Sequence, residues 1–355
     1  MRRGWLRSAI LLVATILGSP VLAQRVLVFP LDQTAGPVSS AWIGTGLAVA
    51  LNEALVSGGV SCIPAEDLQK VFEQEGLVRN PTFAAPSQVA LARQLGASSV
   101  IRGSYAVEER SLKVHLEAYE VAGDVRLLGK WDETRDIDGL LDVTVRLAQS
   151  LFAAMGKPWL GYTPAPPPAF ESYIRGRIAL DPTLEEVFLR KALEISPDYA
   201  EAACYLAMVL QESGRTTEAT GLLVPLEKRP FAKAYLALAT LASIRLDEGR
   251  LQEAQRLLVA SLKAAENPEA HIGLARLYLR QKRYAETLRE LVVAERFGTH
   301  QEEIEALRAQ ARNAGEAPAG QEPQADAPAA DAAAAPGTPS PPAGPAPQAQ
   351  GTPPG

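Results

Sequence analysis

The chain has 355 residues, which is enough for two domains, and a formal net charge of −6. Such an acidic chain is a poor candidate for unspecific nucleic-acid binding. Its two cysteines and three histidines stand at no spacing typical of metal ligands, so we expect no metal and no cofactor.

The first 23 residues have the pattern of a secretory signal peptide. Arg2, Arg3 and Arg7 precede the apolar run Ala9–Leu17, and a small-residue cleavage site ends at Ala23. Cleavage leaves a net charge of −6 − 3 = −9. An uncleaved membrane anchor is the alternative, and no cysteine follows the run to indicate a lipoprotein. We therefore expect a periplasmic protein with no membrane span in its mature chain.

Residues 24–157 predict a small α/β domain with a mixed sheet. Short β-branched or alternating runs predict strands, and longer segments with apolar residues at helical spacing predict helices. Ser39 or Ser40 is expected to cap the first helix, and Ser87 the third. The expected strands are 25–29, 60–63, 98–107, 111–121 and 125–135, and the expected helices are 41–56, 65–74, 88–95 and 137–155.

Two glycines near the start of the first helix, Gly44 and Gly46, allow two interpretations. A phosphate-binding loop would stand between a strand and a helix and would end in a third glycine or in Gly-Lys-Ser. Here both glycines fall inside the helix start. Close packing of the helix against the sheet is therefore favoured.

Several of these segments resemble the amino-terminal domain of the TolB family. The matching pieces are the strand that ends Val28-Phe29-Pro30, the helix entry Ile43–Leu47, the helix-strand unit Leu91–Gly103 and the meander that ends near Trp131. The resemblance covers roughly 130 residues. It implies an α/β domain used for protein contacts in the cell envelope rather than for catalysis.

Proline-rich segments divide the rest of the chain. Residues 158–168 predict a stiff, extended linker. Residues 169–312 predict helical repeats, in which the pair 169–180 and 184–195 caps one end and Glu302–Ala311 caps the other. Residues 313–355 lack aromatic and branched aliphatic side chains and predict a disordered Pro/Ala-rich tail.

A helix-pair pattern repeats at about 34 residues between Tyr199 and Phe297. A small residue near each turn recurs as Ala219, Ala254 and Thr287, and a leucine follows four residues later. Glycine at the turn, Gly214 and Gly249, suits a helix end that needs positive φ. A fixed period of this length indicates a solenoid, with an ordinary helical bundle as the alternative.

The repeats resemble the tetratricopeptide repeat family. Tyr278 fills an aromatic position of the family, whereas its early tryptophan is replaced by Ala203, Leu238 and His271. In this family the first helix of each pair lines a groove that binds protein or peptide partners. The resemblance implies a groove that is acidic at one end and mostly basic at the other. Its residues are Glu201, Met208, Gln211, Glu212, Leu236, Ser243, Leu246, Asp247, Glu269, Arg276, Leu279 and Arg280.

Three functions remain open. A periplasmic adaptor that holds envelope proteins is favoured. An envelope tether that uses the tail is the second. An enzyme is the third, but His115 lies mid-strand and no nucleophile–base spacing accompanies it, so we expect no catalysis and no catalytic residues. Cys62 and Cys204 could pair in an exported protein, although each also fits a buried apolar position.

Overall fold

The structure, a computed structural model, describes residues 25–65, 68, 71, 72 and 84–316. The predicted signal peptide, most of the second predicted helix and the tail beyond residue 316 lie outside these residues. Over the part of the chain that is described, no helix combines the length and apolar character needed to cross a bilayer.

The described residues of the first part form a mixed sheet with the main order β3-β1-β4-β5-β6, and β2 pairs with β4 off this path. β1 runs parallel to β3 and to β4, whereas β4, β5 and β6 form an antiparallel meander. The strands are β1 (Arg25–Val28), β2 (Asp32–Ala35), β3 (Ser61–Cys62), β4 (Ser99–Glu108), β5 (Ser111–Glu120) and β6 (Arg126–Asp136).

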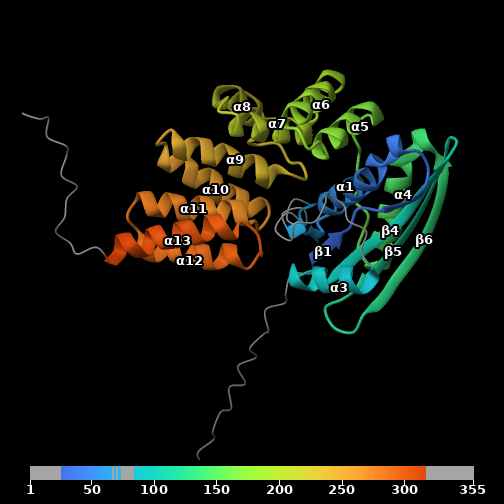
Figure 1. Ribbon diagram of the computed structural model, residues 1–355, viewed down its shortest axis with the longest axis horizontal. Coiled ribbons are helices and arrows are strands. Elements are labelled where there is room, and N and C mark those ends of the chain that lie inside the picture. Colours follow the sequence, from blue (N-terminus) through green and yellow to red (C-terminus); the bar gives the residue numbers. More distant parts are fainter. Residues whose placement is uncertain (1–24, 66–67, 69–70, 73–83, 317–355) are drawn as a thin grey trace, which may run out of the picture. The chain divides into compact units, whose positions relative to one another are not determined.

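Helices cover both faces of the sheet at β1. Val26 and Val28 belong to one apolar core, with residues of α1 (Trp42–Ser57) and α4 (Leu140–Ala154). Leu27 and Phe29 belong to a second core with Ala92 of α3 (Ala85–Gln94). Alternate side chains of a strand point to opposite faces, so α1 and α4 lie on one side and α3 on the other (Figure 1). The predicted mixed-sheet α/β fold is confirmed.

Gly44 allows α1 to approach the sheet closely. Its carbonyl accepts a hydrogen bond from the Leu31 N–H at 3.2 Å. A Cβ at this position would overlap the Leu31 carbonyl oxygen and lie 3.0 Å from the Tyr105 ring. The expectation of close packing, rather than a phosphate loop, is confirmed.

Three local predictions in this domain were wrong. No side chain caps α1, because the 3-10 turn Val38–Ser40 precedes this helix. No side chain caps α3 either, because this helix starts two residues before Ser87. The Ser40 hydroxyl donates instead to the Pro37 carbonyl at 2.6 Å. Strand β2 is absent from the predicted strands, because its sequence is polar and its conformation comes from pairing with β4.

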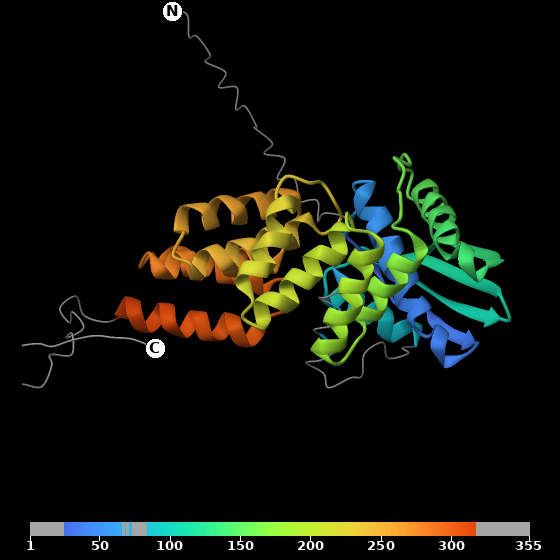
Figure 2. The same ribbon diagram turned by 90° about the horizontal axis from the view of Figure 1, so that it is seen from above.

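The second part consists of helices that follow one another in chain order, from green to red in Figure 2. The capping helix α13 extends four residues into the predicted tail, to Glu316. The helices are α5 (Pro167–Arg177), α6 (Pro182–Ile195), α7 (Ala200–Glu212), α8 (Thr216–Leu223), α9 (Ala234–Asp247), α10 (Leu251–Ala264), α11 (Pro268–Arg280), α12 (Tyr284–Glu295) and α13 (Gln301–Glu316).

The small residues predicted to allow close packing of paired helices are fully buried. Ala219, Ala254 and Thr287 are each 0% exposed. Gly214 and Gly249 adopt φ of 78° and 74° at the turns. Lys282 takes the same place in the third unit with φ of 59°, so this turn accepts a strained non-glycine residue. The tetratricopeptide-like solenoid is confirmed.

The two parts share an apolar core. Helix α5 begins at Pro167, so the last two prolines of the predicted linker form its first turn. Phe170 and Tyr173 of α5 are 1% exposed and belong to the core that also contains Ile43 and Leu47 of α1. No disulfide joins Cys62 and Cys204; Cys204 is buried and Cys62 is half-buried.

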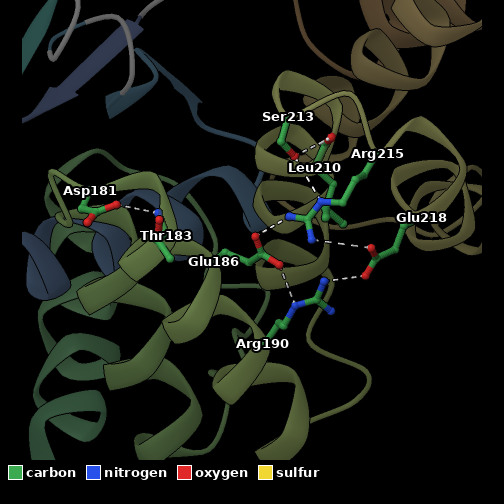
Figure 3. A network of polar contacts seen from close by, with 8 residues as sticks. All are labelled: Asp181, Thr183, Glu186, Arg190, Leu210, Ser213, Arg215 and Glu218. Atoms are coloured by element: carbon green, nitrogen blue, oxygen red, sulfur yellow. Dashed lines mark hydrogen bonds and ion pairs between the residues drawn. The ribbon is translucent and has the colours of Figure 1, made fainter.

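An ion-pair network holds successive second helices together (Figure 3). Arg190 on α6 lies 2.9 Å from Glu186 and 2.5 Å from Glu218 of α8. Arg215, which precedes α8, contacts Glu186 and holds the pKa of that carboxyl below its usual value. The network links the capping pair α5–α6 to the first full repeat.

Candidate partner-binding face

Polar side chains connect the successive helices α7, α9, α11 and α13. Gln211 of α7 donates from Nε2 to Ser243 Oγ of α9 at 3.2 Å. Arg280 Nη2 of α11 lies 3.0 Å from Asp247 Oδ1 of α9. The last contact is the ion pair of Arg276 on α11 with Glu303 on α13. We call these three contacts the polar ladder.

The polar ladder consists almost wholly of predicted groove residues. Glu303 is the exception, although the repeat period would have found it, since it lies 34 residues after Glu269. The ladder also changes the expected charge of the face. Arg276 and Arg280 each pair with a carboxylate, so the basic end predicted from the sequence is largely neutralised.

The remaining predicted residues on this face differ in exposure. Glu212 is exposed at the end of α7, and Met208 is half-buried one turn earlier. Leu279 is half-buried against an apolar cluster formed by α11, α12 and α13. Glu269 is half-buried, and its Oε1 lies 3.3 Å from His300 Nε2.

Two predicted groove residues, Leu236 and Leu246, are buried. Their exposed fractions are 4% and 1%. The resemblance to the repeat family placed both residues in the groove, but both belong to apolar clusters between neighbouring helices. The prediction that they line an open groove was wrong.

Glu201 also departs from the predicted groove. It lies at the start of α7 and lines a polar cavity with Glu53 of α1 and residues 160–165 of the linker. Burial raises the pKa of Glu201 against the opposing effect of Lys233 and Arg229. The structure therefore separates this carboxylate from the polar ladder.

Sequence reasoning missed Arg245, whose side chain is 8% exposed on α9. Its Nε lies 3.0 Å from Glu253 Oε1 and its Nη1 lies 2.8 Å from Glu248 Oε2. Both glutamates follow Arg245 within eight residues. The acidic residue three positions after Arg245 could have predicted an ion pair from the sequence. The contacts join the end of α9 to the turn and to the first turn of α10.

The open face of the sheet carries a second polar cluster, around Glu117 of β5. Its side chain is 9% exposed, and Lys130, Arg102 and His115 lie 2.5, 3.3 and 3.5 Å from its carboxylate oxygens. The Tyr119 hydroxyl donates to it at 2.8 Å. The hydrogen bond from Lys130 is the largest of the effects that lower the pKa of Glu117 to about 2.

The same face aligns Ser104, His115 and Asp132 across β4, β5 and β6. His115 Nδ1 lies 2.8 Å from Asp132 Oδ1. Its Nε2 faces Glu117 rather than the Ser104 hydroxyl. The strand register brings these residue types together, but the contact that would activate a serine is not formed in the described structure.

Comparison with known families agrees with the repeat geometry. Residues 245–311 match the tetratricopeptide repeat family. This segment begins at the end of α9 and includes α10, α11, α12 and most of α13. No curated protein matches the sequence.

Two solved structures are similar to parts of the chain. The C-terminal domain of LpoB from Salmonella enterica matches at 16% identity and a TM-score of 0.26, over 32% of this chain and 83% of that domain. Lipoprotein GNA1162 from Neisseria meningitidis matches at 17% identity and a TM-score of 0.30, over 36% of this chain and 96% of its own. Likenesses at this level carry no functional information.

Proposed function

We propose that the protein is a non-enzymatic adaptor of the periplasm that holds protein or peptide partners on the face formed by α7, α9 and α11. The observation that carries this proposal is the continuous row of polar and half-exposed apolar side chains on successive first helices. The polar ladder connects these helices, and Met208, Glu212 and Leu279 lie within four residues of its members along α7 and α11. Such a row suits a peptide that lies across several repeats.

The periplasmic location rests on the signal-peptide pattern of residues 1–23 and on the TolB-like motifs of the α/β domain. Amino-terminal sequencing of the protein recovered from a periplasmic fraction tests it. We expect a mature chain that begins at Gln24. Recovery of the intact Arg2–Arg7 segment in the membrane fraction would instead indicate a retained anchor.

The absence of catalysis is part of the proposal. The Ser104, His115 and Asp132 row lies on the open face of the sheet, and neither the half-buried Ser104 nor the exposed Asp132 is enclosed. A hydrolytic site would need a hydroxyl bonded to the histidine and donors for an oxyanion. We expect Ser104→Ala and His115→Gln to leave partner capture unchanged.

Differential capture with matched variants tests the face. Met208→Lys combined with Glu212→Lys adds positive charge beside the polar ladder without removing any of its contacts. Val187→Lys combined with Glu194→Lys makes the same kind of change on exposed positions of α6. We expect the first variant to lose partners that the second retains, with equal circular dichroism. Equal capture by both variants would contradict the proposed face.

A further inference from the structure

Strand β6 forms a free edge of the sheet, at the end of the strand order opposite to β3 (Figure 1). It is 11 residues long, and within the described structure it pairs with β5 alone. Over the same part of the chain its backbone forms no hydrogen bond with any other element. The N–H and C=O groups that point away from β5 are therefore a template for a further strand.

Only part of this edge is regular. Gly129 and Leu127 of β6 face consecutive residues of β5, so Leu128 is an extra residue in the strand. Such a bulge bends a strand and interrupts pairing along its edge. The regular segment, Gly129–Asp136, is where a further strand would pair.

Two charges of the regular segment lie on the open face of the sheet and remain accessible. Lys130 contacts Glu117 of β5 at 2.5 Å, and Asp132 contacts His115 of β5 at 2.8 Å. The side chains of Lys130 and Asp132 are nonetheless 50% and 81% exposed. Each of them can therefore meet a second charge across the edge while it keeps its contact with β5.

Antiparallel pairing of two β6 strands makes these charges complementary. Opposite residues of an antiparallel pair have side chains on the same face, so a two-fold axis must lie between the same residue of both strands. An axis at Trp131 sets Lys130 of each copy opposite Asp132 of the other. Moving the axis by one residue sets Lys130 opposite Lys130, or Asp132 opposite Asp132. Of these three registers, the one centred on Trp131 is favoured by charge.

Trp131 suits a position on this axis. It is half-buried and packs against the apolar core that contains residues of α4. Two copies of this side chain would face each other across the paired strands, and aromatic pairs of this kind stabilise antiparallel sheets. Charges on an edge strand ordinarily discourage association, but here their order matches that of a second copy.

We propose that two copies of the chain associate by antiparallel pairing of β6 with β6, with Trp131 at the two-fold axis. The contact uses the same surface on both copies, so it closes as a dimer. One pair of strands buries less surface than a typical stable interface, and we expect a dissociation constant of about 10–100 μM. No residue of the polar ladder lies on β6, so this inference is independent of the partner-binding face.

Sedimentation velocity of the full chain between about 5 and 500 μM tests the association. We expect a monomer–dimer equilibrium, and slower hydrogen exchange of amides in Gly129–Glu133 as the concentration rises, because pairing protects backbone N–H groups. A parent that stays monomeric at about 500 μM would overturn the proposal. So would a dimer in which β6 exchanges as fast as in the monomer, or an edge that is protected only when an unrelated extended peptide is added.

Charge reversal tests the register. Lys130→Asp brings carboxylates together across the axis, and Asp132→Lys brings ammonium groups together. Each variant alone should dimerise at least about tenfold more weakly than the parent. An equimolar mixture of the two should recover the affinity, because every acid then lies opposite a base of the other variant. A mixture that dimerises no better than either variant alone would overturn the proposal.

Matched controls make the same charge changes on another element. Lys191→Asp and Glu194→Lys alter exposed positions of α6, and neither should change dimerisation, alone or mixed. Lys130 also supports Glu117, so circular dichroism must first show that Lys130→Asp is folded. If that variant unfolds, Asp132→Lys decides the question by itself, and dimerisation equal to that of the parent would refute the proposal.

Discussion

Nη2 of Arg280 lies 3.0 Å from Oδ1 of Asp247, a residue 33 positions earlier in the chain. The interval is one repeat, so the two side chains occupy neighbouring places on successive first helices. Arg280 also donates to the Leu246 carbonyl at the end of α9. One side chain thus pairs with a carboxylate and satisfies a helix-terminal carbonyl of the preceding repeat. Residues that the sequence assigned to partner capture therefore also connect successive repeats.

Replacing Arg280 by Gln should change stability only slightly. The side chains of Arg280 and Asp247 are 44% and 67% exposed, so solvent screens their attraction. We expect a loss of about 1 kcal/mol or less in the free energy of unfolding, measured with urea. The swapped pair Arg280→Asp with Asp247→Arg should recover part of it. A loss of several kcal/mol would show that the ladder is a main source of stability.

Gly44→Ala should be strongly destabilising. The added Cβ would overlap the Leu31 carbonyl oxygen, a backbone atom that cannot rotate away. Forcing α1 off the sheet should cost about 1–3 kcal/mol. Gly123→Ala is the matched control, since its Cβ would meet nothing within 4 Å. Urea denaturation curves that coincide for the two variants would contradict the close-packing interpretation.

The imidazole of His271 should make stability depend on pH. Its Nδ1 and Nε2 each lie 2.7 Å from a carboxylate, of Glu290 and Glu266 respectively. Burial opposes protonation, but these two contacts outweigh it and raise the pKa of His271 above its ordinary 6.5. The protonated ring thus stabilises the folded chain below about pH 6.5, and this contribution disappears as pH rises through the higher folded-state value.

The measurement is the midpoint of urea unfolding between pH 5 and 8, for the parent and for His271→Gln. The parent should lose stability relative to the variant as pH rises across this interval. Parallel curves for the two proteins would mean that His271 does not titrate with folding.

Glu117→Gln should weaken the open face of the sheet. The carboxylate pairs with Lys130 and Arg102 and accepts from the Tyr119 hydroxyl, and loss of its charge leaves these donors poorly matched. We expect a cost of about 1–3 kcal/mol at neutral pH. Glu133→Gln is the control, because Glu133 is also a glutamate of the sheet, on β6, and forms no ion pair among the described residues. Equal free energies of unfolding would contradict this assignment.

Acid should remove the same contribution from the parent protein. The folded-state pKa of Glu117 is about 2, against an ordinary 4.5. Its stabilising effect is present above about pH 4.5 and is lost as pH falls toward 2. Acid titration followed by circular dichroism should show a smaller loss of stability in Glu117→Gln over this interval than in the parent.

The repeats and the meander could be predicted from the sequence because their signals are local. The recurring Ala219, Ala254 and Thr287 mark helix contacts at a fixed interval, and all three are buried. Alternation along β5 placed Leu112 and Leu116 inside with His115 on the other face. Hydrophobic periodicity predicts which face of a helix or strand is buried, and it does so without knowledge of the residues that pack against that face.

Only the tertiary structure decided how these surfaces are used. Polar β2 becomes a strand because β4 offers it a partner, and Leu246 leaves the groove because neighbouring helices cover it. Glu201 lies beside Glu53, which is 148 residues earlier in the chain, since α5 packs on α1 and brings the two parts together. Sequence periodicity determined that the chain forms a solenoid of helix pairs. Long-range packing decided which charged side chains lie close together, because contacts between distant segments leave no regular pattern along the chain.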